Sequence, residues 1–367
     1  MSTYQELRIN RTQLDDCQSH RRGLAVELDE GQVLLGVERF AFTANNISYA
    51  ALGDAMGYWR FFPTVEGQGL IPVWGFAVVL QSRCEGIAEG ERFYGYYPMA
   101  SHVVMEPGRV DAQGFTDAVA HRQGLPAIYN HYLNCATDPL YSDDSEAPQM
   151  LLRPLFTTAF LLDEFVAGNQ AFGAKQVIIT SASSKTAISL AYLLSRHRAE
   201  RGQDYEVIGL SSTTNRAFAA GLGCYDRVLE YGEVESLAGD VPSMVIDLAG
   251  NSQLLARLHA HLQAGLRYSC QVGASHWDQR QALPNGLAGP KSVFFFAPNE
   301  GKRLHQLWGA AAFARTLAER WQAFNGFARS WLIFEYGHGA PVVRERYLAA
   351  LRGQLEPQVG VVLSLLE

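Results

Sequence analysis

The chain has 367 residues, of which 48% are apolar and 18% are charged, so it is long enough for two domains and too hydrophobic to be intrinsically disordered. The 30 Lys and Arg residues against 37 Asp and Glu give a net charge of −7, which argues against broad electrostatic binding to nucleic acid. No segment is apolar enough for a transmembrane span, the start of the chain is charged where a secretory signal is apolar, and the five scattered cysteines match no metal or disulfide pattern. We therefore expect a cytoplasmic protein that contacts neither membranes nor nucleic acid.

Residues 20–110 predict a small β-rich unit. Short apolar runs alternate there with Gly, Pro and charged residues, which is typical of strands joined by turns. The runs are GLAVEL, QVLLGVERFAF, PVWGFAVVL, ERFYGYY and SHVVMEP. The acidic segment 137–148 contains two prolines and predicts an exposed loop, and it lacks a histidine that would support a metal site.

From residue 151 the pattern changes to helices alternating with buried strands. A helix is expected in LLRPLFTTAFLLDEFVAG, then a strand at 176–180 and a helix at about 184–199. Further strands are expected in EVIGLSS, RVLEY, SMVIDLAG, YSCQVGA and SVFFFAP. This order predicts a doubly wound parallel sheet with helices on both faces and ligands at the carboxyl ends of its strands.

The end of the chain predicts helices at about 300–324 and near 342–353, and a strand at 359–366 that returns to the first unit.

The run SVFFFA at 292–297 is expected at an edge of the parallel sheet, where an unpaired apolar strand would promote aggregation. We therefore predict a homodimer that joins two sheets at this edge. A monomer at micromolar concentration in light scattering would contradict it.

The segment 177–194, VIITSASSKTAISLAYLL, carries the strongest signal for a ligand. A strand ends, a turn of small residues follows and a helix begins, which presents backbone N–H groups and the positive helix end to an anion. Ser181, Ser184 and Ala187 stand where a dinucleotide-binding loop has glycines, and Lys185 lies in the first helical turn. The residues expected to hold phosphate groups are Ser181, Ser183, Ser184, Lys185 and Thr186.

This segment has two other interpretations. Ser183 or Ser184 could serve only as the cap of the helix. Ser184, Lys185 and Thr186 also resemble the end of a nucleoside-triphosphate loop, but that loop would require glycine at Ile179, which belongs to the strand. The dinucleotide interpretation is therefore favoured.

The end of the next strand indicates which dinucleotide is bound. An NAD site usually has Asp or Glu here to bind the ribose 2′-hydroxyl, whereas residues 209–216, GLSSTTNR, contain no carboxylate. Hydroxyl, amide and guanidinium groups suit a 2′-phosphate instead. The candidate residues are Ser211, Thr213, Asn215 and Arg216. NADP(H) is therefore the expected cofactor, although Thr214 or Asn215 could also cap the following helix.

The chain order resembles that of the medium-chain dehydrogenase/reductase superfamily. A β-rich unit comes first, a dinucleotide-binding unit follows, and the C-terminal segment returns to the first unit. The stretch PVWGFAVVLQSRCEGIAEGERFYGYYPMASHVVMEP resembles strands of that family's catalytic domain, LLRPLFTTAFLL its linking helix, and VIITSASSKTAISLA its cofactor loop. The resemblance spans most of residues 20–300. It implies an α/β protein with a GroES-like catalytic domain at 1–150, completed by about 325–367, and a Rossmann domain at 151–324.

The zinc sites of this superfamily have no counterpart in the matching stretches. Phe76 and Ala77 stand in place of the His and Glu of its G-H-E motif, and no cysteine lies near Asn45. The lobe with four clustered cysteines is also missing. No metal site is therefore expected. The chain resembles the zinc-free quinone and enoyl reductases, in which cofactor hydride reaches a conjugated acceptor.

In enoyl reductases of this fold, a tyrosine shortly after an Asn-containing motif is the candidate proton donor. Tyr58 lies at nearly that offset, Tyr49 is a second candidate, and Asn46 could orient nicotinamide or substrate. Ordinary packing is the alternative role for these tyrosines, since the chain contains 16 of them. By the same resemblance the nicotinamide ribose would border Asp247, Gly250 and Gly273, and the adenosine would border Tyr231.

The sequence thus predicts a zinc-independent, NADP(H)-dependent oxidoreductase. It would transfer hydride to or from a conjugated enone, quinone, enoyl or carbonyl small molecule. The missing glycines leave two alternatives open. One is a non-redox lyase or hydratase on the same fold, and the other is a protein that senses NADP(H) without turnover.

Overall fold

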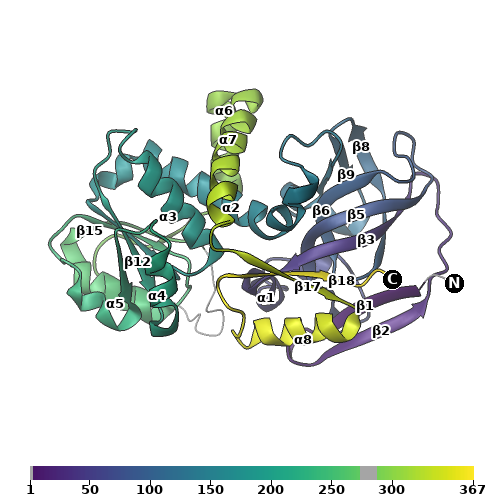
Figure 1. Ribbon diagram of the computed structural model, residues 1–367, viewed down its shortest axis with the longest axis horizontal. Coiled ribbons are helices and arrows are strands. Elements are labelled where there is room, and N and C mark those ends of the chain that lie inside the picture. Colours follow the sequence, from purple (N-terminus) through teal and green to yellow (C-terminus); the bar gives the residue numbers. More distant parts are fainter. Residues whose placement is uncertain (1–2, 273–286) are drawn as a thin grey trace. The chain divides into compact units, whose positions relative to one another are not determined.

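The computed structural model describes residues 3–272 and 287–367, and the chain divides into two compact units (Figure 1). Unit 1 contains Met1–Leu151 and Leu332–Glu367, and unit 2 contains Leu152–Trp331. The α/β fold class predicted from the sequence, a β-rich unit with a parallel-sheet unit, is confirmed. Among the described residues, no helix combines the length and the apolar character needed to cross a membrane.

Unit 1 is built on β-sheets. Its strands are β1 (Thr3–Asn10), β2 (Cys17–Gly23), β3 (Val33–Phe42), β4 (Gln68–Gly69), β5 (Pro72–Ser82), β6 (Arg92–Pro98), β7 (His102–Met105), β8 (Pro107–Asp111), β9 (Gly114–Asp117), β10 (His131–Asn134), β17 (Ile333–His338) and β18 (Val359–Ser364). The large sheet runs β17-β18-β3-β5-β6-β10-β9-β8 with β7 beside β3, and β2-β1-β4 form a small sheet. Side chains such as Phe40, Val73 and Phe93 are fully or almost fully buried in its core.

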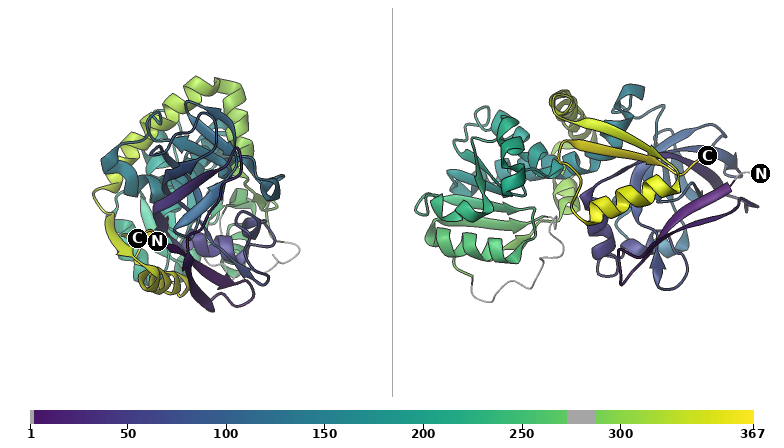
Figure 2. Two further views of the ribbon diagram at one scale, coloured as in Figure 1. Left: turned by 90° about the vertical axis from the view of Figure 1, so that its right-hand side faces the viewer. Right: turned by 60° about the horizontal axis from the view of Figure 1, so that its bottom comes forward.

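The C-terminal residues complete unit 1. β18 pairs antiparallel with β3, with Val362 opposite Ala41, and β17 pairs parallel with β18. Helix α8 (Ala340–Leu351) lies beside these two strands and contacts β1 and β2 (Figure 2). The strand expected at 359–366 corresponds to β18, which ends at Ser364 and pairs with β3. β17 has no counterpart among the predicted strands, because its mixed sequence IFEYGH lacks an apolar run.

Unit 2 is a parallel sheet covered by helices. Its strands are β11 (Gln176–Thr180), β12 (Glu206–Ser211), β13 (Arg227–Glu230), β14 (Ser243–Asp247), β15 (Leu266–Gln271) and β16 (Val293–Phe294), in the order β13-β12-β11-β14-β15-β16. Its helices are α3 (Lys185–His197), α4 (Thr213–Gly221), α5 (Ser252–Leu262), α6 (Ala297–Trp308) and α7 (Ala310–Ala328), and it takes most of α2 (Glu146–Gly168). Ile178, Ile208 and Val245 are completely buried, because both faces of the sheet are covered.

The strand order of unit 2 determines where a ligand can bind. The chain proceeds from β11 to β12 and β13 on one side, then crosses to β14 on the other side of β11. In doubly wound sheets, ligands bind at the carboxyl ends of the strands at this reversal. A ligand of unit 2 is therefore expected to contact the segments that follow β11, β12, β13 and β14.

Some segments differ from the predictions. Gly23 ends β2, and residues 24–28 follow it rather than forming a strand of their own. Residues 44–51, for which the sequence predicts no element, form helix α1, and the Thr43 hydroxyl caps its N-terminus. The helix expected at about 300–324 is two helices, since Gly309, with a φ of +79°, interrupts it between α6 and α7.

Candidate functional site

The loop between β11 and α3 combines a residue in the left-handed conformation with the N-terminus of a helix. Ser181, directly after β11, has a φ of +56°, a left-handed conformation that glycine adopts more easily. For serine this conformation costs about 1–2 kcal/mol, and such strain is concentrated at functional sites. The Ser184 hydroxyl accepts a hydrogen bond from the Ala187 N–H at 3.3 Å, so Ser184 rather than Ser183 caps α3. Thr186 lies half-buried in the first turn of this helix.

Several predicted cofactor residues from distant parts of the sequence meet at this loop. The Asn215 amide on α4 donates to the Ser183 hydroxyl at 3.2 Å. The Tyr231 hydroxyl, after β13, is hydrogen-bonded to the backbone and side chain of Ser181. Burial raises the pKa of Tyr231 to about 12, although these hydrogen bonds oppose the shift. The predicted residues after β11, β12 and β13 therefore form one cluster.

Asp247, at the carboxyl end of β14, belongs to the same edge of the sheet. Its carboxylate accepts a hydrogen bond from the Thr180 hydroxyl at 2.7 Å, which joins the ends of β14 and β11. The N–H of Gly250 lies 3.2 Å from the same carboxylate oxygen. The structure therefore holds the Asp247 carboxylate and the turn after it in place. Gly273, the remaining predicted cofactor residue, lies outside the described residues.

Ser211 ends β12 with a polar atom that lacks a partner. Its side chain is completely buried, and its hydroxyl has no hydrogen-bond partner within the described part of the chain. A buried orphan hydroxyl costs about 1–3 kcal/mol, so its persistence needs an explanation. Helix α4, which follows, is capped by Ser212 and not by Thr214 or Asn215.

The corner predicted to lack a carboxylate contains one. β12 and β13 pair in parallel with Ser211 opposite Glu230, which brings Glu230 next to the start of α4. The Thr213 hydroxyl donates to the Glu230 carboxylate at 2.6 Å, and a guanidinium nitrogen of Arg216 lies 3.4 Å from it. Arg216 also approaches Glu233 at 3.6 Å. The prediction from the second strand was therefore incomplete, because the third strand supplies the acidic group.

In unit 1, the predicted catalytic residues lie in a group of aromatic rings that we call the tyrosine cluster: Tyr49, Tyr58, Trp74, Tyr96 and Tyr129. Tyr49 on α1 and Tyr58 in the short 3-10 turn Tyr58–Arg60 have ring centres 4.6 Å apart. The hydroxyls of Tyr58 and Tyr129 lie 3.4 Å apart. Trp74 on β5 and Tyr96 on β6 face each other across the sheet, with ring centres 5.1 Å apart.

Exposure separates the two candidate proton donors. Tyr49 is buried, whereas Tyr58 is half-buried and therefore closer to solvent. Burial raises the pKa of both phenols, while the hydrogen bond with Tyr129 lowers that of Tyr58. Both hydroxyls are thus protonated near neutral pH. Tyr58 is the better placed to donate a proton to a ligand.

Both polar atoms of the Asn46 side chain are hydrogen-bonded to backbone groups. Its amide oxygen accepts from the Thr43 N–H at 2.8 Å, and its amide nitrogen donates to the Pro72 carbonyl at 3.0 Å. Asn46 is also almost fully buried. It therefore ties α1, which carries Tyr49, to β5, so it is a positioning residue rather than a ligand contact.

The positions expected to lack zinc ligands are occupied by packed side chains. The Phe76 ring lies against those of Tyr94 and Tyr141, with ring centres 5.3 and 5.7 Å away, and Ala77 is completely buried. Across residues 3–272 and 287–367, no group of three or more His, Cys, Asp or Glu side chains is arranged to hold a metal ion.

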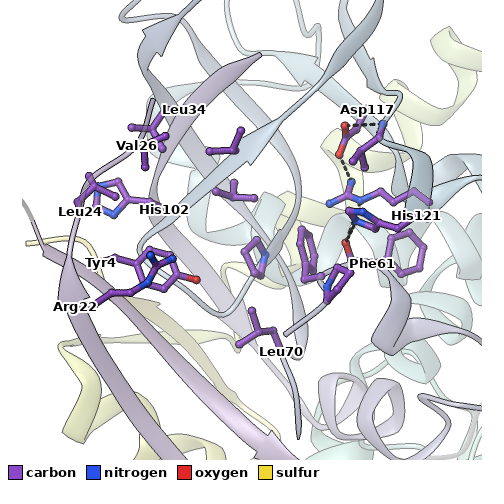
Figure 3. A pocket seen from close by; sticks show the side chains of 17 residues that line it. Tyr4, Arg22, Leu24, Val26, Leu34, Phe61, Leu70, His102, Asp117 and His121 are labelled. Atoms are coloured by element: carbon purple, nitrogen blue, oxygen red, sulfur yellow. Dashed lines mark hydrogen bonds and ion pairs between the residues drawn. The ribbon is translucent and has the colours of Figure 1, made fainter. Parts of the chain in front are cut away.

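A cavity of about 300 Å³ opens in unit 1 (Figure 3). Asp117 and Phe61 lie on the same side of it, and Arg122 also lines it. A guanidinium nitrogen of Arg122 is 2.9 Å from the Asp117 carboxylate, and Arg122 Nε donates to the Phe61 carbonyl at 3.1 Å. Because Phe61 directly follows the turn that carries Tyr58, this ion pair anchors that turn.

Sequence reasoning missed Trp74, Tyr96, Tyr129 and Glu230. A signal for the first two was available, because Trp74 and Phe76 alternate along β5 in the same way as Tyr94 and Tyr96 along β6. Tyr129 and Glu230 had no such signal. Their positions depend on how distant segments pair.

Comparison with known proteins supplies the family. Residues 40–356 match the family described as "Protein of unknown function (DUF2855)". The chain belongs to this family. No curated protein matches the sequence.

Solved structures share the fold over nearly the whole chain. CurA from Vibrio vulnificus in complex with NADPH is 11% identical, with a TM-score of 0.63 and 99% of each chain covered. The mitochondrial 2-enoyl thioester reductase Etr1p/Etr2p heterodimer from Candida tropicalis is 11% identical, with a TM-score of 0.58, 99% of this chain covered and 100% of that one. The Etr1p/NADP/crotonyl-CoA complex has a TM-score of 0.57 at 11% identity, with 99% of this chain and 100% of that one covered. The predicted fold, a β-rich unit with a parallel-sheet unit, is thus shared over nearly the whole chain with these reductase structures.

Proposed function

We propose that this protein is a zinc-independent, NADP(H)-dependent oxidoreductase that acts on a conjugated enone, quinone, enoyl or carbonyl small molecule. The observation that carries the proposal is the turn after β11, where Ser181 adopts the left-handed backbone of a phosphate-binding loop and meets residues from β12 and β13. The fold shared with CurA, which was solved with NADPH, supports it.

The residues of unit 2 fit this cofactor. The N-terminus of α3 and the Lys185 ammonium suit the pyrophosphate, and the orphan hydroxyl of Ser211 suits a polar group of the adenosine half. Thr213 and Arg216, which contact Glu230 in this structure, would bind the 2′-phosphate when the cofactor is present. By the resemblance, Asp247 and Gly250 would border the nicotinamide ribose. When bound, the cofactor supplies the hydride.

Unit 1 would supply the proton. We assign Tyr58 as the donor, because this residue is half-buried and its hydroxyl is held by Tyr129. A phenol can stabilise an oxygen that gains negative charge during reduction and can then protonate it. Tyr129 positions this hydroxyl, and the Arg122–Asp117 pair fixes the turn on which Tyr58 lies.

The first test is a calorimetric titration with NADPH, with NADH and ATP as comparisons. We expect micromolar affinity for NADPH, weakened about tenfold or more by Lys185→Ala, because a charge-assisted contact to phosphate is lost. Lys175→Ala is the matched control, since this exposed lysine pairs with Asp204 at the opposite end of β11. Failure to bind any dinucleotide would contradict the proposal and favour the non-redox lyase or hydratase.

The pH dependence of NADPH binding gives a second prediction. Burial lowers the pKa of the Lys185 ammonium to about 8, so in the free protein it loses its charge above this pH. A bound phosphate favours the charged form, so binding above pH 8 must take up a proton. Affinity should therefore fall as the pH rises from 8 to 9.5, by at most about tenfold per unit. Lys185→Arg should flatten this fall, because arginine stays charged. An equally steep fall in that variant would contradict this role for Lys185.

Removing the negative charge of Glu230 should increase the affinity of the protein for NADPH. Glu230 holds Thr213 and Arg216 and would repel a 2′-phosphate. Because these groups are partly exposed, we expect Glu230→Gln to tighten NADPH binding only about three- to fivefold, with little change for NADH. Glu206→Gln is the control, since Glu206 pairs with Arg227 at the other end of these strands. An equal effect on both cofactors would count against a 2′-phosphate at this corner.

The expected homodimer is retained as a proposal. β16 lies at the edge of the parallel sheet, and its Val293 and Phe294 side chains are 47% and 54% exposed. An exposed apolar edge favours pairing with a second copy. Light scattering at micromolar concentration should give a dimer that Phe294→Lys converts to a monomer. A wild-type monomer would refute the proposal.

A further inference from the structure

Two buried polar atoms on neighbouring strands of unit 1 have no partner. The indole nitrogen of Trp74 on β5 and the hydroxyl of Tyr96 on β6 make no hydrogen bond within the described part of the chain. The two residues are directly opposite in the register of the sheet, and Tyr96 is completely buried. A buried donor without a partner destabilises the fold, so two side by side indicate a missing acceptor.

The polar neighbour of both atoms is the Tyr49 hydroxyl, which can donate or accept a hydrogen bond. An indole N–H can only donate. The Tyr49 hydroxyl lies close to both groups, yet it leaves both without a well-formed hydrogen bond. Burial raises the pKa of Tyr49 and of Tyr96, so both phenols keep their protons across the working pH range. Three protonated donors thus lie together, and a ligand carbonyl oxygen would supply the acceptor that Trp74 and Tyr96 lack.

The rings around this point form aromatic walls. The Trp74 ring is stacked on that of Tyr94, with ring centres 5.6 Å apart and planes 17° apart. The rings of Tyr96 and Tyr129 are 4.7 Å apart. Trp74, Tyr58 and Tyr129 are only half-buried, so one side of the cluster reaches solvent, whereas the two orphan atoms are buried. Aromatic faces and edges pack best against another flat π system.

We propose that Trp74 and Tyr96 donate hydrogen bonds to the carbonyl oxygen of a planar, cyclic conjugated carbonyl compound, a quinone or an aryl enone, bound at the tyrosine cluster. This inference rests on the proposed function and names its substrate class. Both hydrogen bonds would strengthen as the oxygen gains negative charge during reduction, so they would favour the reaction as well as binding. Tyr58, in the same cluster, is the proton donor.

The test measures binding without cofactor, by calorimetry, with two flat probes. One is 1-tetralone, an aryl ketone, and the other is tetralin, the same ring system without the oxygen. We expect the wild type to bind the ketone about tenfold more tightly than the hydrocarbon. Trp74→Phe and Tyr96→Phe should each abolish most of this preference while leaving the affinity for tetralin similar.

A matched control separates binding from stability. Tyr97, the next residue on β6, uses its hydroxyl to donate to the Phe93 carbonyl at 2.9 Å. Tyr97→Phe should lower the Tm and keep the ketone preference. Tyr96→Phe should keep or raise the Tm, because it removes an orphan hydroxyl, and lose the preference.

Other outcomes would overturn the inference. Equal wild-type affinity for both probes, or a preference that survives both substitutions, would mean that the two donors bind no substrate oxygen. Because the cofactor is absent, this failure is distinct from a failure of the NADPH titration. If NADPH binds but the protein shows no preference for the ketone, the proposed substrate class is wrong and the proposed cofactor is unaffected.

Discussion

Asp117→Asn is expected to lower the free energy of unfolding by about 3–5 kcal/mol, because it leaves the buried guanidinium of Arg122 without a counter-charge. The two side chains are 1% and 2% exposed, and their charged atoms are 2.9 Å apart. Arg122 also donates to the Tyr132 hydroxyl and the Phe61 carbonyl, so it cannot turn toward solvent without breaking these bonds. Urea denaturation would measure the loss.

The control for this prediction is Asp204→Asn. Asp204 pairs with Lys175, but it is 96% exposed, so the loss should stay below about 1 kcal/mol. The double substitution Asp117→Asn with Arg122→Met should recover part of the stability lost in the single variant, because the unpaired charge is gone. A similar small loss for Asp117→Asn and Asp204→Asn would contradict a buried ion pair.

Tyr58→Phe should reduce kcat for NADPH-dependent reduction of a quinone or aryl enone by about 10²–10³-fold, with the Kd for NADPH unchanged. The reason is that phenylalanine keeps the ring packed against Tyr49 but removes the proton donor. Steady-state kinetics and a cofactor titration together would measure both quantities. Tyr347→Phe is a control, because its hydroxyl is bonded to the Leu14 carbonyl outside the cluster.

A pH profile would distinguish a proton donor from a packing residue. Activity should fall as the pH rises through the pKa of Tyr58, because the deprotonated phenol has no proton to give. The hydrogen bond with Tyr129 lowers that pKa, so Tyr129→Phe should move the fall to higher pH. If Tyr58→Phe retained full kcat, the donor would have to be another group, and Tyr49 would be the next candidate.

Local patterns in the sequence were enough to recognise the parallel-sheet unit and the turn between β11 and α3. The strands containing Ile178, Ile208 and Val245 are continuous apolar runs because both of their faces are buried, and the helices between them have caps of small polar residues. Because parallel strands end on the same side of a sheet, Ser183 and Asn215 could be expected to meet, and they do. These inferences need only chain order and periodicity.

The remaining features depend on pairing between distant segments. Glu230 reaches Arg216 through the register of two strands, Tyr129 meets Tyr58 across 71 residues of chain, and Asn46 is occupied by the carbonyl of Pro72. Composition and spacing along the chain do not predict such contacts. Which side chains meet depends on which distant segments lie next to each other in the folded protein. Order and periodicity along the chain thus give its elements, and long-range packing determines which polar groups are satisfied and which remain available to a ligand.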